Sequence, residues 1–145
     1  MKPFSTWTAL ERDAVLSSFA RHISESRAKG LPWTRKACAE KSMQSIVDGD
    51  VEAVLLGDYA LVFTVGTDWC SHSTSLCEQL LIRVFRQGGT FKDVTSGLDE
   101  LADIFACDQV VVGNGVSRPG LARLYQRAGF VRANEYYVKE YTWAS

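Results

Sequence analysis

Residues that bind metals or form disulfides are scarce in this sequence. It holds 4 cysteines and 2 histidines, and no two cysteines form a C-x-x-C pair. Zinc sites use cysteines and histidines at short, regular spacings, so we expect no metal. Cys70 or Cys77 with His72 leaves a cysteine hydrolase open as an alternative, because a catalytic cysteine and histidine need to meet only in the fold.

An excess of one charge and long apolar runs are also missing. Lys and Arg total 16 against 17 Asp and Glu, a net charge of −1, which gives no electrostatic reason to expect nucleic acid or an anionic membrane surface as a partner. Apolar runs such as Tyr59–Val65 are far shorter than the roughly 20 residues of a membrane span. The N-terminus lacks the apolar centre of a secretory signal. We therefore expect a cytoplasmic protein with no nucleic-acid or membrane partner.

The first part of the chain changes from helical spacing to strand-like runs. Two helices are expected over about residues 6–26 and 35–47, with Thr34 as the N-cap of the second. Two strands and a two-residue hairpin signal between them follow at Glu52–Leu56, Tyr59–Val65 and Gly57–Asp58. The second of these runs is apolar on both faces, which is typical of a central strand covered on both sides.

The second part of the chain alternates strands with helices. Its expected elements are a strand at Cys77–Phe85, a helix from Phe91 to Phe105, a strand at Gln109–Val112, a helix at Pro119–Ala128 and a last strand at Val131–Trp143. The 145 residues show no repeat or linker. We predict one α/β (α+β) domain over residues 1–145, with a mixed sheet of about six strands.

A glycine pair, Gly88–Gly89, stands between a predicted strand and a predicted helix. Glycines let the backbone approach a phosphate closely, and the first N–H groups of a helix favour negative charge. Arg86 and Thr90 add a cation and a hydroxyl. A plain strand-to-helix turn explains the same residues, and neither the G-x-G-x-x-G fingerprint nor a Walker motif is present. Both interpretations stay open on these residues alone.

Two stretches resemble the GNAT N-acetyltransferase superfamily. The sequence L-Y-Q-R-A-G-F at Leu124–Phe130 is similar to a Leu-Tyr-x-x-x-Gly-Phe stretch near the end of that family's chains. The sequence R-Q-G-G-T-F at Arg86–Phe91 resembles its Arg/Gln-x-x-Gly-x-Gly/Ala loop, although Phe91 replaces the last small residue. Arg118 stands where many members carry an Asn before the Tyr.

The resemblance implies a GNAT-like mixed, mostly antiparallel twisted sheet with helices on both faces. It also implies an acyl-CoA-dependent N-acetyltransferase, in which an unknown primary amine attacks the thioester of acetyl-CoA directly. The chain further resembles small, diverged GNAT-like proteins of tailed phages, for which the location would be the host cytoplasm. A catalytically inactive virion component or host-protein-binding module is the alternative function.

The resemblance also implies which residues form the site. Tyr125 would protonate the departing thiolate, because a phenol with a pKa of about 10 stays protonated at neutral pH, and Glu78 would take the proton of the amine. The cofactor would lie against the loop amides, the arginines and the end of the strand, at Val84, Phe85, Arg86, Gln87, Gly88, Gly89, Thr90, Asn114 and Arg118.

Several roles stay open at this point. Asp68, His72 or a water chain could replace Glu78 as the base, and Tyr125 could be a packed helix residue. The tail tyrosines, Tyr136, Tyr137 and Tyr141, fit a terminal strand whose exposed aromatic face would form a homodimer contact.

Overall fold

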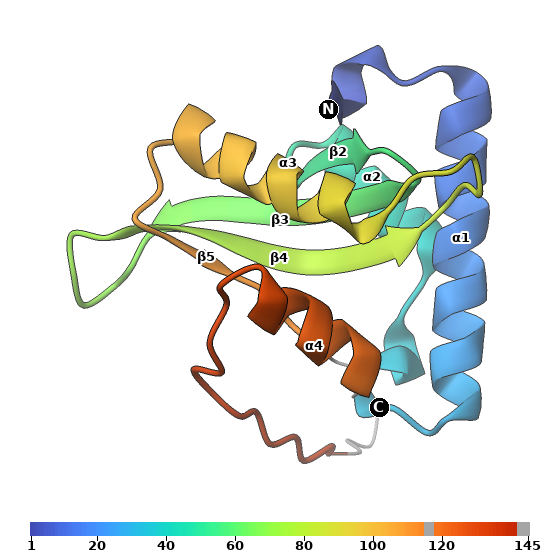
Figure 1. Cartoon of the computed structure of the whole chain (residues 1–145). Helices are drawn as coiled ribbons and strands as arrows, with labels where there is room; N and C mark the ends of the chain where they lie inside the picture. The colour runs from blue at the N-terminus through green and yellow to red at the C-terminus, as the bar shows by residue number, and fades with distance from the viewer. Residues whose placement is uncertain (115–117, 142–145) are drawn as a thin grey trace.

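A computed structural model describes residues 1–114 and 118–141 (Figure 1). Its first elements in chain order are β1 (Lys2–Pro3), η1 (Phe4–Thr6), α1 (Ala9–Ala28), η2 (Pro32–Lys36), α2 (Ala39–Val47), β2 (Glu52–Leu56) and β3 (Tyr59–Thr67). The chain continues with β4 (Thr74–Arg83), α3 (Phe91–Ile104), β5 (Gln109–Val111) and α4 (Pro119–Arg127). No helix in these described ranges has the length and hydropathy that crossing a bilayer requires.

One sheet with the strand order β1-β2-β3-β4-β5 organises the fold. The first four strands pair antiparallel, and β5 pairs with β4 in parallel. The hairpin between β2 and β3 closes where Leu56 pairs with Tyr59, so Gly57–Asp58 form the expected two-residue turn. Gly57 has φ +57°, a left-handed conformation that glycine adopts without steric cost. The predicted mixed, mostly antiparallel sheet is confirmed.

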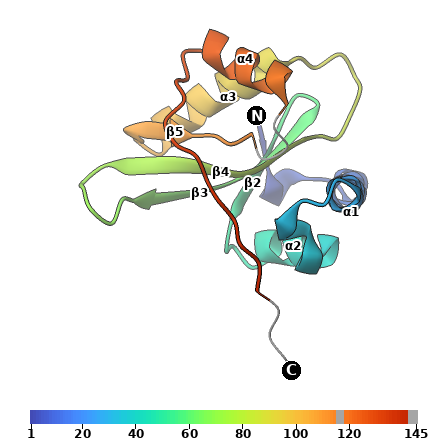
Figure 2. The ribbon, with the colours of Figure 1, turned by 90° about the horizontal axis from the view of Figure 1, so that it is seen from below.

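Helices cover both faces of the sheet, as predicted (Figure 2). Because successive strand residues point to opposite faces, the apolar runs of β2 and β3 supply two cores at once. Leu55 and Val62 pack with Phe19 of α1, while Leu56 and Phe63 pack on the α3 side. This double burial is why both runs are almost continuously apolar.

The helix boundaries differ from those predicted at two places. α1 begins at Ala9, because Thr8 caps it: its side chain accepts from the N–H of Glu11, and the Glu11 carboxylate accepts from the N–H of Thr8. Thr34 is not the N-cap of α2. It lies in the 3-10 turn η2 and donates to the carbonyl of Leu31, so α2 starts only at Ala39.

The sheet has five strands in the described residues, where about six were predicted. Residues 131–141 form no strand and pair with none of the five strands of the described chain. The Tyr137 hydroxyl donates to Glu135 within the segment, and the large apolar side chains of the segment are exposed. Trp143 lies outside the described residues. The homodimer contact stays a prediction.

Candidate active site

A fork between β4 and β5 frames the site. The two strands pair only over Ser75–Cys77 and Gln109–Val111, and β4 continues to Arg83 without a neighbour on that edge among the described residues. A β-bulge toward β3 gives β4 one extra residue, Gln79. Bulges re-aim the side chains around them, and this one follows Glu78 at the point where β5 departs.

Glu78 and Tyr125 meet at this fork. The Tyr125 hydroxyl, from α4, donates to Oε2 of Glu78 at 2.9 Å, and the N–H of Gly113 donates to the same oxygen at 3.3 Å. Gly113 lies just after β5, so Glu78 links β4 to the chain on the other side of the fork and to α4. The structure thus brings together the two residues expected to carry catalysis.

Aromatic rings enclose the Tyr125 side chain, which is 5% exposed. Phe91 and Phe130 each contact its ring edge-to-face at 5.2 Å between centroids. Burial raises the pKa of the Tyr125 phenol, and the neighbouring Glu78 carboxylate raises it further. Burial also raises the pKa of Glu78, against the lowering effect of its two hydrogen bonds. The phenol therefore keeps its proton across the neutral range, and the carboxylate is a stronger base than a solvated glutamate.

A cleft of about 580 Å³ opens beside the free edge of β4. Its walls come from α1, the end of β4, the loop before α3, and α4, and it includes Leu124, the chain neighbour of Tyr125. Three arginines line it without an ion-pair partner among the described residues: Arg21, Arg86 and Arg118. Guanidinium groups match phosphate oxygens in geometry and charge, so the cleft suits an anionic ligand that carries phosphates.

His22 belongs to the α1 wall of this cleft. Its ring stacks on Trp33, with centroids 5.5 Å apart and planes at 25°. Burial lowers the pKa of His22, and the positive charge of Arg118 lowers it further. The imidazole is therefore neutral at pH 7.

The loop around Gly88–Gly89 was expected to offer its backbone N–H groups to a pyrophosphate, but two of these groups already donate to carboxylates of the protein. The N–H of Gly89 donates to Oδ2 of Asp58 at 2.9 Å, and the N–H of Thr90 donates to Oδ2 of Asp93 at 2.8 Å. Of the three residues expected to offer amides to a pyrophosphate, only Gly88 has an N–H with no acceptor in the part of the chain that the structure describes. Gly88 has φ +90° and open space around it.

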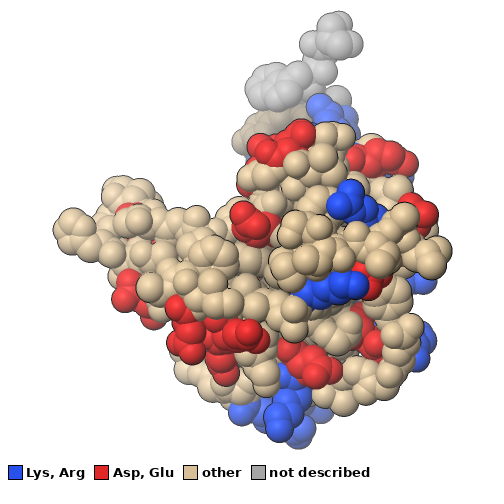
Figure 3. All heavy atoms as spheres, turned by 90° about the horizontal axis from the view of Figure 1, so that it is seen from above, with Lys and Arg blue, Asp and Glu red and all other residues tan. Residues whose placement is uncertain are grey.

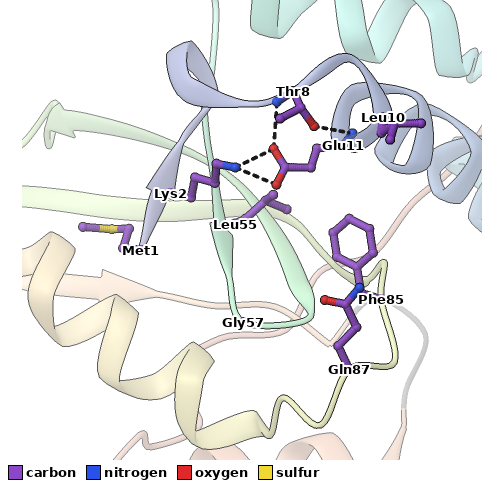
Figure 4. A pocket seen from close by; sticks show the side chains of 9 residues that line it. All are labelled: Met1, Lys2, Thr8, Leu10, Glu11, Leu55, Gly57, Phe85 and Gln87. Carbon is purple, nitrogen blue, oxygen red and sulfur yellow. Dashed lines mark hydrogen bonds and ion pairs between the residues drawn. The ribbon is translucent and has the colours of Figure 1, made fainter.

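The side chains around the loop divide between two hollows. Arg86 lines the arginine cleft, whereas Phe85 and Gln87 line a separate hollow of about 530 Å³ near the N-terminus (Figure 4). Val84 packs against the α1-side core, and the N–H groups of Val84 and Phe85 donate to the carbonyl of Asp58. Among the described residues, the backbone edge that stays open is therefore that of β4 before Val84.

Asn114 joins the two sides of the loop before α4. Its side-chain amide donates to the carbonyl of Arg118 at 2.8 Å, and its side-chain oxygen accepts the N–H of Arg118 at 2.9 Å. Both polar atoms of Asn114 thus hold Arg118 in place at the N-cap of α4, and Arg118 reaches the cleft.

In the described residues, no side-chain hydrogen bond joins any of the alternative site residues to the Glu78–Tyr125 pair. Asp68 lies in the loop between β3 and β4, where its carboxylate accepts from Ser75 and Gln109, and His72 is exposed in the same loop. All four cysteines are free, and no hydrogen bond joins one to His72 within residues 1–114 and 118–141. The same residues contain no group of three or more metal-ligating side chains.

Sequence reasoning missed four residues of the site: Asp58, Arg83, Arg21 and His22. Asp58 had been interpreted only as half of a turn, and Arg83 as part of a strand. Nothing in the spacing of Arg21 and His22 marks them as lining a cleft. Their positions depend on how α1 and the β2–β3 turn pack against the loop before α3.

No protein-family model and no curated protein sequence matches this chain. Solved structures do resemble it. A ribosomal-protein-alanine N-acetyltransferase from Brucella melitensis biovar Abortus superposes with a TM-score of 0.62 at 11% identity, covering 90% of this chain and 94% of that one. An aminoglycoside acetyltransferase from an uncultured soil metagenomic sample superposes with a TM-score of 0.61 at 13% identity, covering 92% of this chain and 91% of that one. A GNAT family acetyltransferase from Staphylococcus aureus superposes with a TM-score of 0.59 at 10% identity, covering 93% of this chain and 95% of that one. This chain therefore has the fold of the GNAT acetyltransferases.

Proposed function

We propose that this protein is an N-acetyltransferase that moves an acetyl group from acetyl-CoA to a primary amine. The observation that carries the proposal is the Tyr125–Glu78 hydrogen bond at the β4–β5 fork, beside a cleft lined by Arg21, Arg86 and Arg118. The named acetyltransferases among the similar structures support the same class of reaction.

The donors around the cleft fit acetyl-CoA. Arg21, Arg86 and Arg118 would hold its phosphates, with the N–H of Gly88 as a backbone donor. The edge of β4 beyond Cys77, which pairs with no other described strand, offers N–H and C=O groups to the amides of a pantetheine arm. When bound, acetyl-CoA supplies a thioester carbonyl that an amine can attack.

The Glu78–Tyr125 pair would move both protons of the reaction. The attacking amine gives a proton to the Glu78 carboxylate, directly or through one water. Once Glu78 is protonated it no longer attracts the Tyr125 hydroxyl, which can then protonate the departing thiolate. Because the pKa of Tyr125 is raised, the resulting phenolate recovers its proton from Glu78, and the pair returns to its starting state.

The binding step is tested by calorimetric titration of acetyl-CoA into the purified protein. We expect a double change, Arg86→Ala with Arg118→Ala, to weaken binding at least tenfold, because two phosphate partners are lost. Arg123→Ala is the matched control, since Arg123 is an exposed residue of α4 that does not line the cleft. Absence of binding at millimolar acetyl-CoA would leave a GNAT-fold protein that works without this cofactor.

The chemical step is tested by the release of free thiol with a panel of primary amines. Tyr125→Phe and Glu78→Gln should each lower kcat by about 10²–10⁴-fold, the usual contribution of a positioned acid or base. The raised pKa of Glu78 places the acid limb of the rate–pH profile above the ordinary glutamate pKa, with the rate rising as the carboxylate forms. A limb that persists in Glu78→Gln would contradict the role of Glu78.

A further inference from the structure

Asp58 is a buried carboxylate outside the proposed catalytic pair. It is the second residue of the β2–β3 turn and is 3% exposed. Burial acts to raise the pKa of Asp58, but Arg83 and the N–H groups of Gln87 and Gly89 together hold it below the ordinary value. The side chain is therefore an anion at neutral pH, placed against the loop that precedes α3.

The carboxylate of Asp58 takes the backbone donors of that loop. Its oxygens accept the N–H of Gln87 at 3.1 and 2.9 Å, and Oδ2 also accepts the N–H of Gly89 at 2.9 Å. The backbone carbonyl of Asp58 accepts the N–H groups of Val84 and Phe85 at 2.8 and 3.0 Å. One residue of the hairpin turn thus binds four amides of the segment Val84–Gly89.

Arg83 completes the arrangement from the other side. Its Nη2 lies 3.2 Å from Oδ2 of Asp58 and 3.2 Å from the carbonyl of Gly89, and its Nε donates to the carbonyl of Phe85. Asp58 therefore binds loop amides while Arg83 binds loop carbonyls. A buried anion that accepts from a guanidinium and from two backbone N–H groups of one loop favours a single backbone arrangement of that loop.

The glycine at position 89 is explained by the same contact. A Cβ atom there would lie 2.7 Å from the backbone nitrogen of Asp58 and 2.8 Å from its carboxyl carbon. These separations are shorter than any real Cβ contact. Position 89 therefore requires glycine because both the backbone and the side chain of Asp58 pack on it.

We propose that Asp58 is the positioning residue of the phosphate-binding loop, an internal carboxylate that occupies the amides of Gln87 and Gly89 and so holds the Arg86 side chain in the cleft. The proposal rests on the acetyl-CoA function proposed above. Within the loop, Arg86 lines the arginine cleft while its neighbours Phe85 and Gln87 line the opposite hollow, and that alternation depends on the backbone that Asp58 fixes. Because two amides are consumed internally, recognition of the phosphates falls mainly to arginine side chains.

The test compares two ligands that share the thioester arm. Acetyl-CoA carries phosphates, and S-acetyl-pantetheine carries none. We expect Asp58→Asn and Asp58→Ala to weaken acetyl-CoA binding at least tenfold in calorimetry, while the affinity for S-acetyl-pantetheine changes less than twofold. Equal weakening of both ligands, or unchanged acetyl-CoA affinity in a folded variant, would overturn the positioning role.

Asp68→Asn is the matched control. Asp68 is also a hydrogen-bonded carboxylate in a loop between two strands, but its partners are Ser75 and Gln109 at the other end of β4. The Asp68→Asn variant should bind both ligands with unchanged affinity, even if the substitution lowers the melting temperature of the protein. If Asp58→Ala fails to fold, the binding test is carried out with Asp58→Asn alone, because that substitution keeps the size of the side chain.

Hydrogen exchange separates failure of this inference from failure of the proposed function. The amides of Gln87 and Gly89 should exchange at least tenfold faster in Asp58→Asn than in the wild type, with no change in Asp68→Asn. If the wild type binds neither ligand, the acetyltransferase proposal and the ligand part of this inference both fall, whereas the exchange result still decides whether Asp58 fixes the loop. Unchanged exchange would show that it does not.

Discussion

His22 shows how the cleft changes the chemistry of a single residue. The ring is partly buried against Trp33, and Arg118 adds a positive charge nearby, so both effects favour the neutral imidazole and lower the pKa. The unfolded chain binds this proton more readily than the folded protein does. His22 therefore lowers the stability of the folded protein as the pH falls below the ordinary histidine pKa of about 6.5.

Replacing Arg118 separates the effect of burial on the pKa of His22 from the effect of the Arg118 charge. We expect Arg118→Gln to raise the pKa of His22 toward its ordinary value without reaching it, because burial remains. The measurement is an NMR titration of the His22 ring proton, with exposed His72 as the internal reference. Arg123→Gln on the outer side of α4 is the control, and an equal shift in that variant would assign the effect to general charge instead of to Arg118.

The residues of the site differ in how far the sequence could reveal them. Tyr125 and Glu78 were found because a motif and a strand position pointed to them, and the structure places them 2.9 Å apart. Asp58 could not be found in this way. Its role depends on a turn that reaches a loop 25 or more residues further along the chain, and neither segment alone shows that contact.

At the scale of elements, the α3–β2 contact explains the glycine at position 97 inside α3, where a glycine is less favourable than alanine. A Cβ at Gly97 would lie 2.4 Å from Cδ2 of Leu56, and both residues are buried. We expect Gly97→Ala to lower the free energy of unfolding. The gain in helix propensity is about 1 kcal/mol, and overpacking a tight core typically costs about 1–3 kcal/mol.

Ser96→Ala is the comparison on the same helix, since Ser96 is exposed and its replacement meets no neighbour across the interface. That change should stabilise the protein by a few tenths of a kcal/mol through propensity alone. Urea denaturation of both variants measures the two free energies. A Gly97→Ala protein as stable as Ser96→Ala would show that Leu56 moves aside at no cost.

The last segment shows where element prediction failed. Residues 131–141 have the tyrosines and valines of a strand, but β-propensity expresses fit to a neighbouring strand more than a preference of the backbone. Residues 131–141 pair with no strand of the described chain, and their large apolar side chains stay exposed. The buried strands β2 and β3 were predicted correctly because packing on both faces leaves a strong signal in the sequence.

At the scale of the whole molecule, a net charge of −1 hides an uneven distribution. Acidic side chains gather over α3 (Figure 3), where Asp99, Glu100 and Asp103 are exposed. Arginines line the cleft on the other side of the fork. Composition could not reveal this local cationic site, because the two groups of charges cancel in the sum.

This distribution predicts how acetyl-CoA binding responds to salt. Long-range attraction is weak at a net charge near zero, so the favourable field is confined to the cleft. The Debye length falls from about 14 Å at 50 mM to about 4 Å at 500 mM monovalent salt. We expect the Kd for acetyl-CoA to rise about tenfold over this range, as screening weakens the arginine–phosphate contacts.

S-acetyl-pantetheine provides the comparison, because its thioester arm has no phosphate for the arginines to attract. Its Kd should change less than about twofold over the same range, since screening acts only on charged contacts. In the double variant Arg86→Ala with Arg118→Ala, the salt dependence for acetyl-CoA should also become shallower. If both ligands respond equally to salt, the arginines do not select phosphates, and binding would depend on the open edge of β4 instead.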